Sequence, residues 1–274
     1  MTSYGALCTE FYDLDKPLAP TEALAYYLER ARDVGGRILE PMCGSGRFLI
    51  PMLQAGVRVD GVDCAPAMLE ACRRRANALG LEVELYAQGL EALALPHRYA
   101  LAFVPAGSIG LIAEGPGFSA ALTNLSAHLE PGAPLLLEVV NSVSENPDSR
   151  SGAATEDEPI HCEPRTVKCP DGATIAYSCV VSRSRAPEAI SYAGTYEKRE
   201  GGRLIARETE ELVLSIRPAE SLVAELLRCG FDSARVIRGP EAAFLEGSGC
   251  TLIEARGREP RGGAARPRPP RRLN

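Results

Sequence analysis

Tryptophan is absent from this chain of 274 residues, and aromatic residues make up only 5% of it. Proteins that stack unpaired or flipped nucleobases depend on aromatic side chains, so this scarcity argues against a nucleic-acid substrate. The formal net charge of −6 does not supply the basic surface that nucleic-acid binding needs. We therefore do not expect a nucleic acid as partner.

Metal ligands are scarce as well. The three histidines are His97, His128 and His161, and none stands at zinc-ligand spacing from any of the nine cysteines. No two cysteines are separated by two residues, as they are in a CxxC motif. The sequence thus predicts no metal site, and it indicates buried free thiols in a reducing compartment.

Long apolar runs are missing too. No window reaches 18 apolar residues, and the longest uncharged run near the middle, residues 99–113, contains Pro105, Gly107 and Gly110. A membrane span is therefore not expected. The first residues lack the basic flank and apolar stretch of a secretory signal, so we expect a cytoplasmic location.

Charge is distributed unevenly along the chain. From Arg256 to the end there are seven arginines and one glutamate, a net charge of +6 that leaves −12 on the other 255 residues. The end of the chain has almost no large apolar residue to bury. We interpret residues 257–274 as a disordered basic tail.

Strand-like and helix-like segments alternate through the first half of the chain. Short apolar runs predict strands over 37–40, 57–63, 81–86, 99–104 and 134–140, and helices are expected over 22–33, 47–55, 66–79 and 117–129. Such alternation indicates βαβ units and a parallel sheet. The strands are nearly continuous apolar runs, as in a sheet that is covered on both faces.

The pattern changes after Asn141. Residues 142–164 are polar, and strands separated by turns then follow over 173–181, 190–196 and 204–215. A helix over 219–228 and strands over 233–238 and 250–255 complete the chain. The sequence therefore predicts an α/β fold in which a mostly parallel seven-stranded sheet carries an antiparallel β insertion after its fifth strand. We expect residues 1–141 and 206–256 to form the main domain and 142–205 to form the insertion.

Three features stand in order at predicted strand ends. A Gly-x-Gly turn, Gly44 to Gly46, follows the first strand, Asp63 ends the second, and Gln88 follows the third. Glycines let the backbone approach a ligand closely, and an acid at the end of the second strand can accept hydrogen bonds from a ribose. Alone, the turn could be a tight loop and Asp63 a helix cap. Together they indicate a cofactor that contains adenosine.

The turn does not fit a dinucleotide. In the fingerprint Gly-x-Gly-x-x-Gly the third glycine allows close helix–strand packing, and here Leu49 stands at that position. Arg47 and Phe48 are also bulky where a pyrophosphate needs bare backbone. The site therefore suits a nucleoside without phosphates.

Residues 38–46, Ile-Leu-Glu-Pro-Met-Cys-Gly-Ser-Gly, resemble motif I of the class I S-adenosylmethionine-dependent methyltransferases, and residues 62–69, Val-Asp-Cys-Ala-Pro-Ala-Met-Leu, resemble the second motif of that family. The resemblance covers residues 20–140 well and 211–255 in outline. It implies a Rossmann-like fold and S-adenosylmethionine as cofactor. The chain departs from the family where Met42 replaces the first glycine of the turn, so that this residue has a negative φ or is strained.

The resemblance also implies which residues surround the cofactor. Gly44 and Gly46 would pass beneath its methionine part, Glu40 would orient the loop or bind the ammonium, and Arg47 would balance the carboxylate or lie in solvent. Asp63 would bind the ribose. The remaining candidates flank the adenine or cover the site, with ordinary core or surface roles as the alternatives: Tyr12, Cys43, Cys64, Met68 and Gln88.

The acceptor is expected at the ends of the fourth and fifth strands. In-line displacement at the methyl carbon needs mostly positioning, with a general base only for a protonated acceptor such as an amine or a phenol. Ser108, Glu138 and His161 are the candidate catalytic residues. The insertion resembles the caps of small-molecule N- and O-methyltransferases, which cover the acceptor and can also form a homodimer, so a small-molecule acceptor is predicted.

Two other functions fit parts of the sequence. The arginine-rich tail would suit methylation of RNA or protein. Met42 and the lack of an obvious base would suit an S-adenosylmethionine-binding scaffold without turnover.

Overall fold

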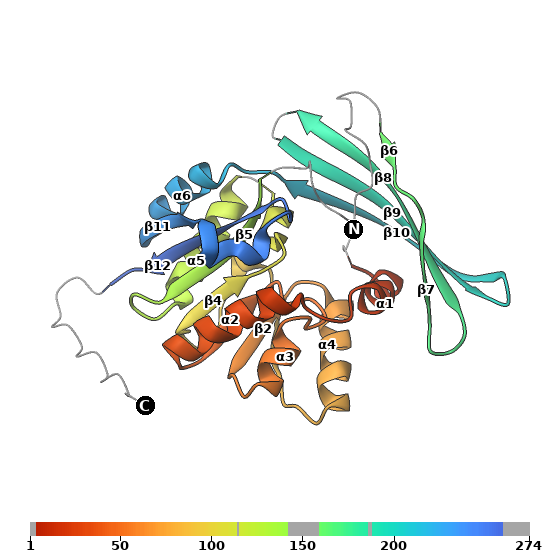
Figure 1. The fold of residues 1–274 in the computed structure, drawn as a ribbon, viewed down its shortest axis with the longest axis horizontal. Helices are drawn as coiled ribbons and strands as arrows, with labels where there is room; N and C mark the ends of the chain where they lie inside the picture. The colour runs from red at the N-terminus through yellow and green to blue at the C-terminus, as the bar shows by residue number, and fades with distance from the viewer. Residues whose placement is uncertain (1–3, 114, 142–158, 186–187, 260–274) are drawn as a thin grey trace.

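The computed structural model describes residues 4–113, 115–141, 159–185 and 188–259, which form two β-sheets (Figure 1). The larger sheet has seven strands in the order β11-β12-β5-β4-β1-β2-β3, and the smaller has five antiparallel strands, β10-β9-β8-β6 with β7 paired to β8. The smaller sheet follows β5 in the chain. The predicted fold, a mostly parallel sheet with an antiparallel insertion after the fifth strand, is confirmed.

The seven strands of the larger sheet lie close to their predicted positions. They are β1 (Ile38–Pro41), β2 (Val59–Asp63), β3 (Glu84–Ala87), β4 (Leu101–Val104), β5 (Pro134–Val140), β11 (Phe231–Ile237) and β12 (Cys250–Gly257). The first five are parallel, and β12 runs antiparallel to both β5 and β11. The strand order reverses between β1 and β4, and ligands of open α/β sheets bind at the carboxyl ends of strands at such a point.

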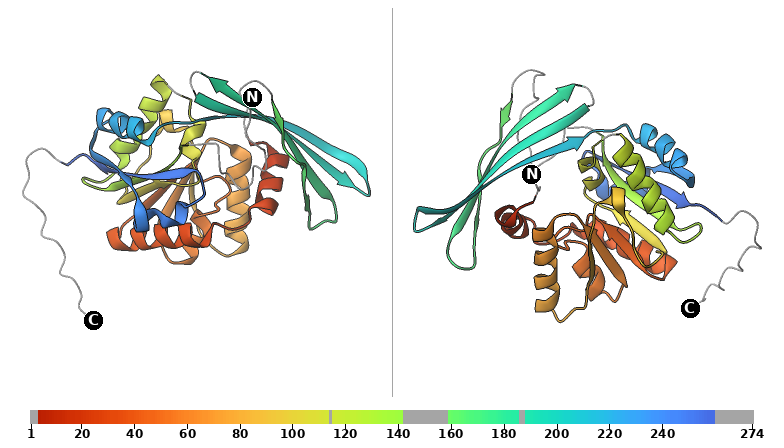
Figure 2. Two further views of the ribbon diagram at one scale, coloured as in Figure 1. Left: turned by 45° about the horizontal axis from the view of Figure 1, so that its top comes forward. Right: turned by 180° about the vertical axis from the view of Figure 1, so that it is seen from behind.

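Helices cover both faces of this sheet (Figure 2). One face packs against α2 (Thr21–Val34), α3 (Leu49–Gln54), α4 (Pro66–Ala78) and η3 (Gly239–Leu245), and the other against η1 (Leu90–Ala92), α5 (Pro116–His128) and α6 (Ala219–Arg228). Ala23, Tyr27 and Ala31 of α2 are buried at intervals of four residues, the spacing of one helical face. Both cores consist of apolar side chains held between a sheet and its helices.

The smaller sheet, here called the cap, consists of the five strands from β6 to β10. Its long strands are β8 (Thr174–Arg185), β9 (Glu188–Glu200) and β10 (Arg203–Ser215), and the short ones are β6 (Ile160–His161) and β7 (Arg165–Lys168). β10 pairs with β9 as far as Ser215, beyond residue 206, where we expected the main domain to resume. Most of the predicted polar loop and residues 260–274 of the predicted basic tail lie outside the described residues.

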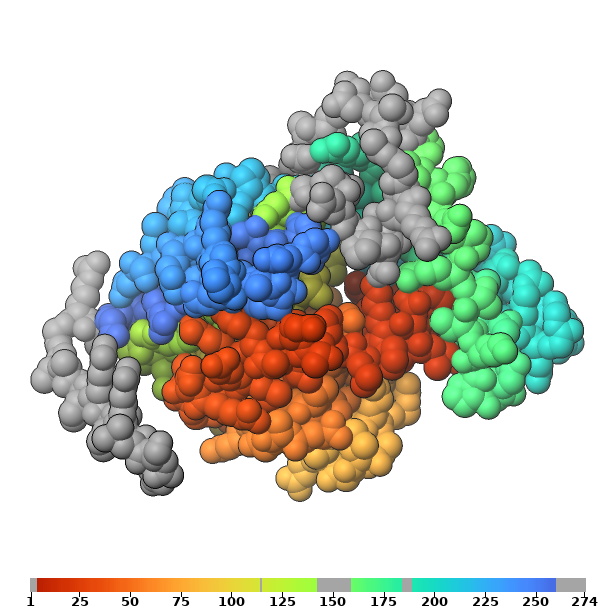
Figure 3. Space-filling view, in the orientation of Figure 1, coloured from red at the N-terminus to blue at the C-terminus, as the bar shows by residue number. Residues whose placement is uncertain are grey.

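A helix that was not predicted, α1 (Ala6–Asp15), lies between the cap and the main domain. In the space-filling view its red atoms adjoin the green strands of the cap and the orange α4 (Figure 3). Leu7, Cys8 and Phe11 of α1 form a third core with residues of the cap, among them Ile175 and Tyr196. Within the described ranges no helix is both long and apolar enough to cross a membrane.

Candidate active site

The loop between β1 and α3, residues 42–48, is here called the cofactor loop. The amide of Cys43 donates to the carbonyl of Val62 at 3.0 Å, and the amide of Gly46 donates to the carbonyl of Cys43 at 3.0 Å, which forms a tight turn. Met42, Gly44 and Gly46 have φ angles of 60°, 54° and 83°. Met42 is thus left-handed, the strained alternative for a residue with a Cβ.

Asp63 fastens the cofactor loop to the neighbouring strand. Its Oδ2 accepts the amide of Gly44 at 2.8 Å and its Oδ1 accepts the amide of Ala65 at 2.8 Å. Burial raises the pKa of Asp63, and hydrogen bonds from backbone amides lower it. Each carboxylate oxygen has a second lone pair. Asp63 can therefore hold the loop and still accept the hydroxyl groups of a ligand.

Glu40 lies buried beneath the same loop. Its exposed fraction is 2%, and its Oε2 has no hydrogen-bond partner among the described residues. Burial, and secondarily the Asp63 carboxylate, raise the pKa of Glu40 well above its usual range. A buried acceptor without a donor is costly, so the site fits a ligand that brings an ammonium or an N–H group.

The loop also leaves room where a ligand would lie. A Cβ on Gly44 would have only the sulfur of Met68 nearby, at 3.8 Å, so Met68 lies beside this glycine. Gly46 differs, because a Cβ there would stand 2.6 Å from the sulfur of Cys72. Gly44 therefore keeps space open, and Gly46 permits packing against α4.

Tyr12 and Arg47 meet at the outer side of the cofactor loop. Tyr12 of α1 lies beside Arg47, and the Nε of Arg47 donates to the carbonyl of Leu18 at 2.7 Å. Burial is the main cause that raises the pKa of Tyr12, and the Arg47 cation lowers it. The structure thus places Tyr12 next to the loop and shows a contact between Arg47 and the carbonyl of Leu18 that the sequence did not reveal.

The other cofactor candidates differ in their surroundings. Cys43 and Met68 are buried, whereas Cys64 is exposed beside Asp63. The Gln88 side chain accepts the amide of Ala94 at 2.7 Å and donates to the carbonyl of the same residue at 3.1 Å. Gln88 therefore stabilises its own loop, and it would have to exchange these bonds to reach an adenine.

Glu138 of β5 is held by two donors. The hydroxyl of Tyr27 donates to Oε1 at 2.6 Å and the amide of Ala106 donates to Oε2 at 2.7 Å. Burial raises the pKa of Glu138, and both hydrogen bonds lower it. Ala106 has a φ of 58°, and the hydroxyl of Ser108, two residues later, donates to the carbonyl of Pro105 at 3.0 Å. Glu138 thus fixes the loop that carries Ser108.

His161 lies apart from this pair. It is exposed on β6, where it pairs with Val180 of the cap. Within the described residues no hydrogen bond joins it to Glu138 or Ser108. Of the three catalytic candidates, the structure brings together Glu138 and the loop of Ser108, and leaves His161 in the cap.

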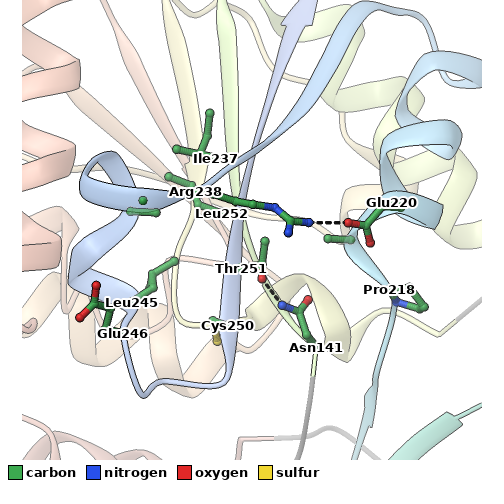
Figure 4. Close-up of a pocket in the computed structure, with 13 residues that line it drawn as sticks. Asn141, Pro218, Glu220, Ile237, Arg238, Leu245, Glu246, Cys250, Thr251 and Leu252 are labelled. Atoms are coloured by element: carbon green, nitrogen blue, oxygen red, sulfur yellow. Dashed lines mark hydrogen bonds and ion pairs between the residues drawn. The ribbon is translucent and has the colours of Figure 1, made fainter.

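A pocket of about 450 Å³ lies at the carboxyl end of β5, between η3, α6 and β12 (Figure 4). Asn141 is hydrogen-bonded to Thr251 there, and Glu220 and Arg238 form an ion pair of 2.6 Å. Cys250 lines the same pocket, and the Glu138 carboxylate contributes to raising its thiol pKa, after burial. Sequence reasoning did not connect these residues with the site, because no motif links them. Nowhere in the described ranges do three or more His, Cys, Asp or Glu side chains gather as a metal site would require.

A family model described as a methyltransferase domain matches residues 38–132, which include the cofactor loop, Asp63 and β4. A ubiquinone biosynthesis O-methyltransferase of Xanthomonas axonopodis pv. citri is 27% identical over 146 residues, which are 52% of this chain and 60% of the relative. One from Methylocella silvestris is 39% identical over 59 residues, 22% of this chain and 23% of that protein. The matches therefore span at most about 60% of the length of these curated relatives.

Solved structures share the whole architecture. An amino pentose methyltransferase of calicheamicin biosynthesis from Micromonospora echinaspora, solved with S-adenosylmethionine bound, aligns with a TM-score of 0.65 and 19% identity over 94% of this chain and 99% of that one. A sugar N-methyltransferase from a Streptoalloteichus species aligns with a TM-score of 0.64 and 17% identity over 87% of this chain and 86% of that one. At these identities the likeness shows a common fold that includes the cap.

Proposed function

We propose, from the premise that residues 38–132 form a methyltransferase domain within a class I fold, that the whole chain is an S-adenosylmethionine-dependent methyltransferase of a small-molecule acceptor. The observation that carries the proposal is the cofactor loop itself, held by Asp63 above the buried, unpartnered Oε2 of Glu40. The loop lies inside the matched segment. Asp63 and Glu40 thus provide the acidic side chains that a binding site for a cationic nucleoside needs.

The residues of this cofactor site would have separate roles. Asp63 would accept the ribose hydroxyls, and Oε2 of Glu40 would accept the ammonium. Tyr12 would cover the cofactor, and Arg47, which lies beside Tyr12, would face its carboxylate. Cys64 and Met68 would flank the adenine, and Gln88 would reach its edge after exchanging its bonds with Ala94. Cys43 would contribute through the loop to which it belongs. When bound, S-adenosylmethionine supplies a methyl group on a sulfonium, which is a good leaving group, so the chain needs mainly to position the acceptor and exclude water.

The acceptor would approach from the carboxyl ends of β4 and β5. Ser108 and the pocket beside Cys250 border this region, and Glu138 keeps the loop after β4 in place. Since both oxygens of Glu138 already accept hydrogen bonds, we assign it a positioning role before that of a base. His161 would act as a base only on an acceptor that binds against the cap.

Isothermal calorimetry with S-adenosylmethionine and with NAD tests the cofactor assignment. We expect binding of the former alone, and binding about 10–100-fold weaker in Asp63→Ala, because hydrogen bonds to a charged group are worth about 1.5–3 kcal/mol each and water replaces them in part. Asp33→Ala, which removes an exposed carboxylate of α2, is the matched control. Unchanged binding in Asp63→Ala would refute the site, and binding of neither ligand would refute the function.

We assign cofactor binding and acceptor binding to different sheets. We assign the cofactor to residues 1–141 and 206–256 and the covering of the acceptor to the insertion over 142–205. β10 exposes Val213 by 54%, and we assign this part of β10 to a homodimer through the cap. Sedimentation equilibrium of wild type and of Val213→Lys tests the dimer, which the lysine should weaken.

The location assigned to the protein is the cytoplasm. All nine cysteines are free thiols in the described structure. Free thiols persist in a reducing compartment, whereas secreted proteins tend to oxidise them to disulfides.

A further inference from the structure

Helix α1 connects the cap to the cofactor loop. On one side the ring of Phe11 lies 5.3 Å from that of Tyr177 and 5.5 Å from that of Tyr196, both in the cap. On the other side Tyr12 lies beside Arg47 of the cofactor loop. Adjacent residues of one helix thus contact the two parts of the molecule.

A second contact reaches the loop from the same turn of α1. Asp13 pairs with Arg75 of α4 at 3.2 Å, and the same guanidinium nitrogen donates to the carbonyl of Ser45 at 3.1 Å. Its other terminal nitrogen donates to the carbonyl of Pro17 at 2.9 Å. The position of α1 therefore determines where Tyr12 and Asp13 meet the cofactor loop.

The N-terminus of α1 depends on the cap for its hydrogen bonds. Gly5 is the N-cap residue and has no side chain to accept the free amides, and the first turn contains no acid. Glu208 of β10 takes this role: its Oε2 accepts the amide of Leu7 and its Oε1 that of Cys8, both at 3.0 Å. These are the second and third residues of the helix, whose amides an N-cap side chain normally satisfies. The carboxylate also complements the positive end of the helix dipole.

Gly5 makes room for this carboxylate. A Cβ on Gly5 would stand 2.5 Å from the nearest carboxylate atoms of Glu208, closer than any real contact. An alanine there would therefore displace the carboxylate from the two amides. The chain thus provides a second, independent way to break the same contact.

We propose that Glu208 is a positioning residue for the cofactor site: by capping α1 it holds Tyr12 and Asp13 against Arg47 and Arg75, so that the cap governs the affinity of the cofactor loop. The inference rests on the proposed function for the identity of the ligand. It assigns to the cap a task beyond covering the acceptor.

Calorimetry with S-adenosylhomocysteine tests the proposal on the full chain. We expect Glu208→Ala to weaken binding about 3- to 10-fold, the scale of a lost N-cap. Glu208→Gln should recover part of the loss, because its amide oxygen can still accept one N–H group. Glu211→Ala, an exposed acid on the same strand, should bind as wild type does. Gly5→Ala serves if Glu208→Ala does not fold.

A double-mutant cycle separates positioning from a general loss of stability. If Glu208 acts through α1 and Tyr12, then Glu208→Ala and Tyr12→Phe should not be additive in the dissociation constant, since each breaks the same connection. Affinity of Glu208→Ala within twofold of wild type, or full additivity with Tyr12→Phe, would overturn the proposal.

Amide hydrogen exchange of the ligand-free protein keeps this test separate from that of the proposed function. In Glu208→Ala the amides of residues 6–15 and 44–47 should exchange faster than in Glu211→Ala, and equal exchange would overturn the proposal. If wild type does not bind S-adenosylhomocysteine, the proposed function fails, and the exchange result still decides whether Glu208 positions the loop.

Discussion

Tyr27 of α2 donates its hydroxyl to the buried carboxylate of Glu138 at 2.6 Å, across a sequence separation of 111 residues. The second oxygen of that carboxylate accepts the amide of Ala106. This chain of two hydrogen bonds ties a helix on one face of the sheet to the loop that follows β4. The acceptor side of the site is therefore shaped by α2 as well as by the strand ends.

Replacing Tyr27 by phenylalanine should destabilise the fold by about 1–3 kcal/mol, because an oxygen of a buried carboxylate loses its donor. The pKa of Glu138, which this hydrogen bond lowers, should rise as well. Urea denaturation at pH 7 measures the loss. Tyr26→Phe is the matched control, because the buried hydroxyl of Tyr26 has no partner among the described residues and its removal should cost nothing. Equal losses in the two variants would contradict the assignment.

Glu40→Gln should make the ligand-free protein more stable than wild type, by a margin that grows with pH. The pKa of Glu40 is about 4.5 in the unfolded chain and well above that in the folded one, so the folded state binds more protons between the two values. Stability from this group is complete below pH 4.5 and decreases as pH rises toward the folded pKa, at up to about 1.4 kcal/mol per pH unit.

Urea denaturation of Glu40→Gln and wild type at pH 5.5, 6.5 and 7.5 checks this expectation. Taking the difference at each pH removes the titration of all other groups. A difference that does not change with pH would refute the raised pKa. The same variant should bind S-adenosylmethionine more weakly, because a neutral amide replaces the acceptor of the ammonium.

The sequence predicted the strands and the cofactor loop because both have local signals, apolar runs and closely spaced glycines. It did not predict α1, since the group that caps this helix, Glu208, stands 201 residues away from Leu7. The hydrogen bond from Tyr27 to Glu138 was not predicted either, because these residues are also far apart in the sequence. Met42 was recognised as a departure, but only the structure shows that it takes the strained, left-handed alternative.

Ala106→Gly should stabilise the protein by about 1 kcal/mol. Ala106 is exposed and has a φ of 58°, so its Cβ contributes strain and little burial. Ala25→Gly is the control of opposite sign, because Ala25 is an exposed residue in the interior of α2, where glycine costs about 1 kcal/mol. Thermal melting of both variants measures the difference. A loss of stability in Ala106→Gly would show that the left-handed backbone there is not strained.

Alanine variants of three glycines with positive φ should separate a role in ligand binding from a role in packing. A Cβ on Gly56 would have no other atom within 4 Å, so Gly56→Ala should show only the backbone cost of about 1–2 kcal/mol. Gly46→Ala should cost about 1–3 kcal/mol more, because Cys72 and Ile50 would have to move. Gly44→Ala should match Gly56→Ala in stability, since only Met68 lies nearby.

Affinity should rank these three variants differently from stability. A methyl group on Gly44 would project into the space that the cofactor loop leaves open. Of the three variants, Gly44→Ala should therefore lose the most affinity for S-adenosylmethionine relative to its loss of stability. Gly56 lies at the far end of α3 from the loop, so Gly56→Ala should bind as wild type does. Calorimetry beside urea denaturation gives both rankings. If the three variants ranked in the same order by affinity as by stability, the glycines of the loop would act in folding alone. The open space at Gly44 would then not be where the cofactor binds.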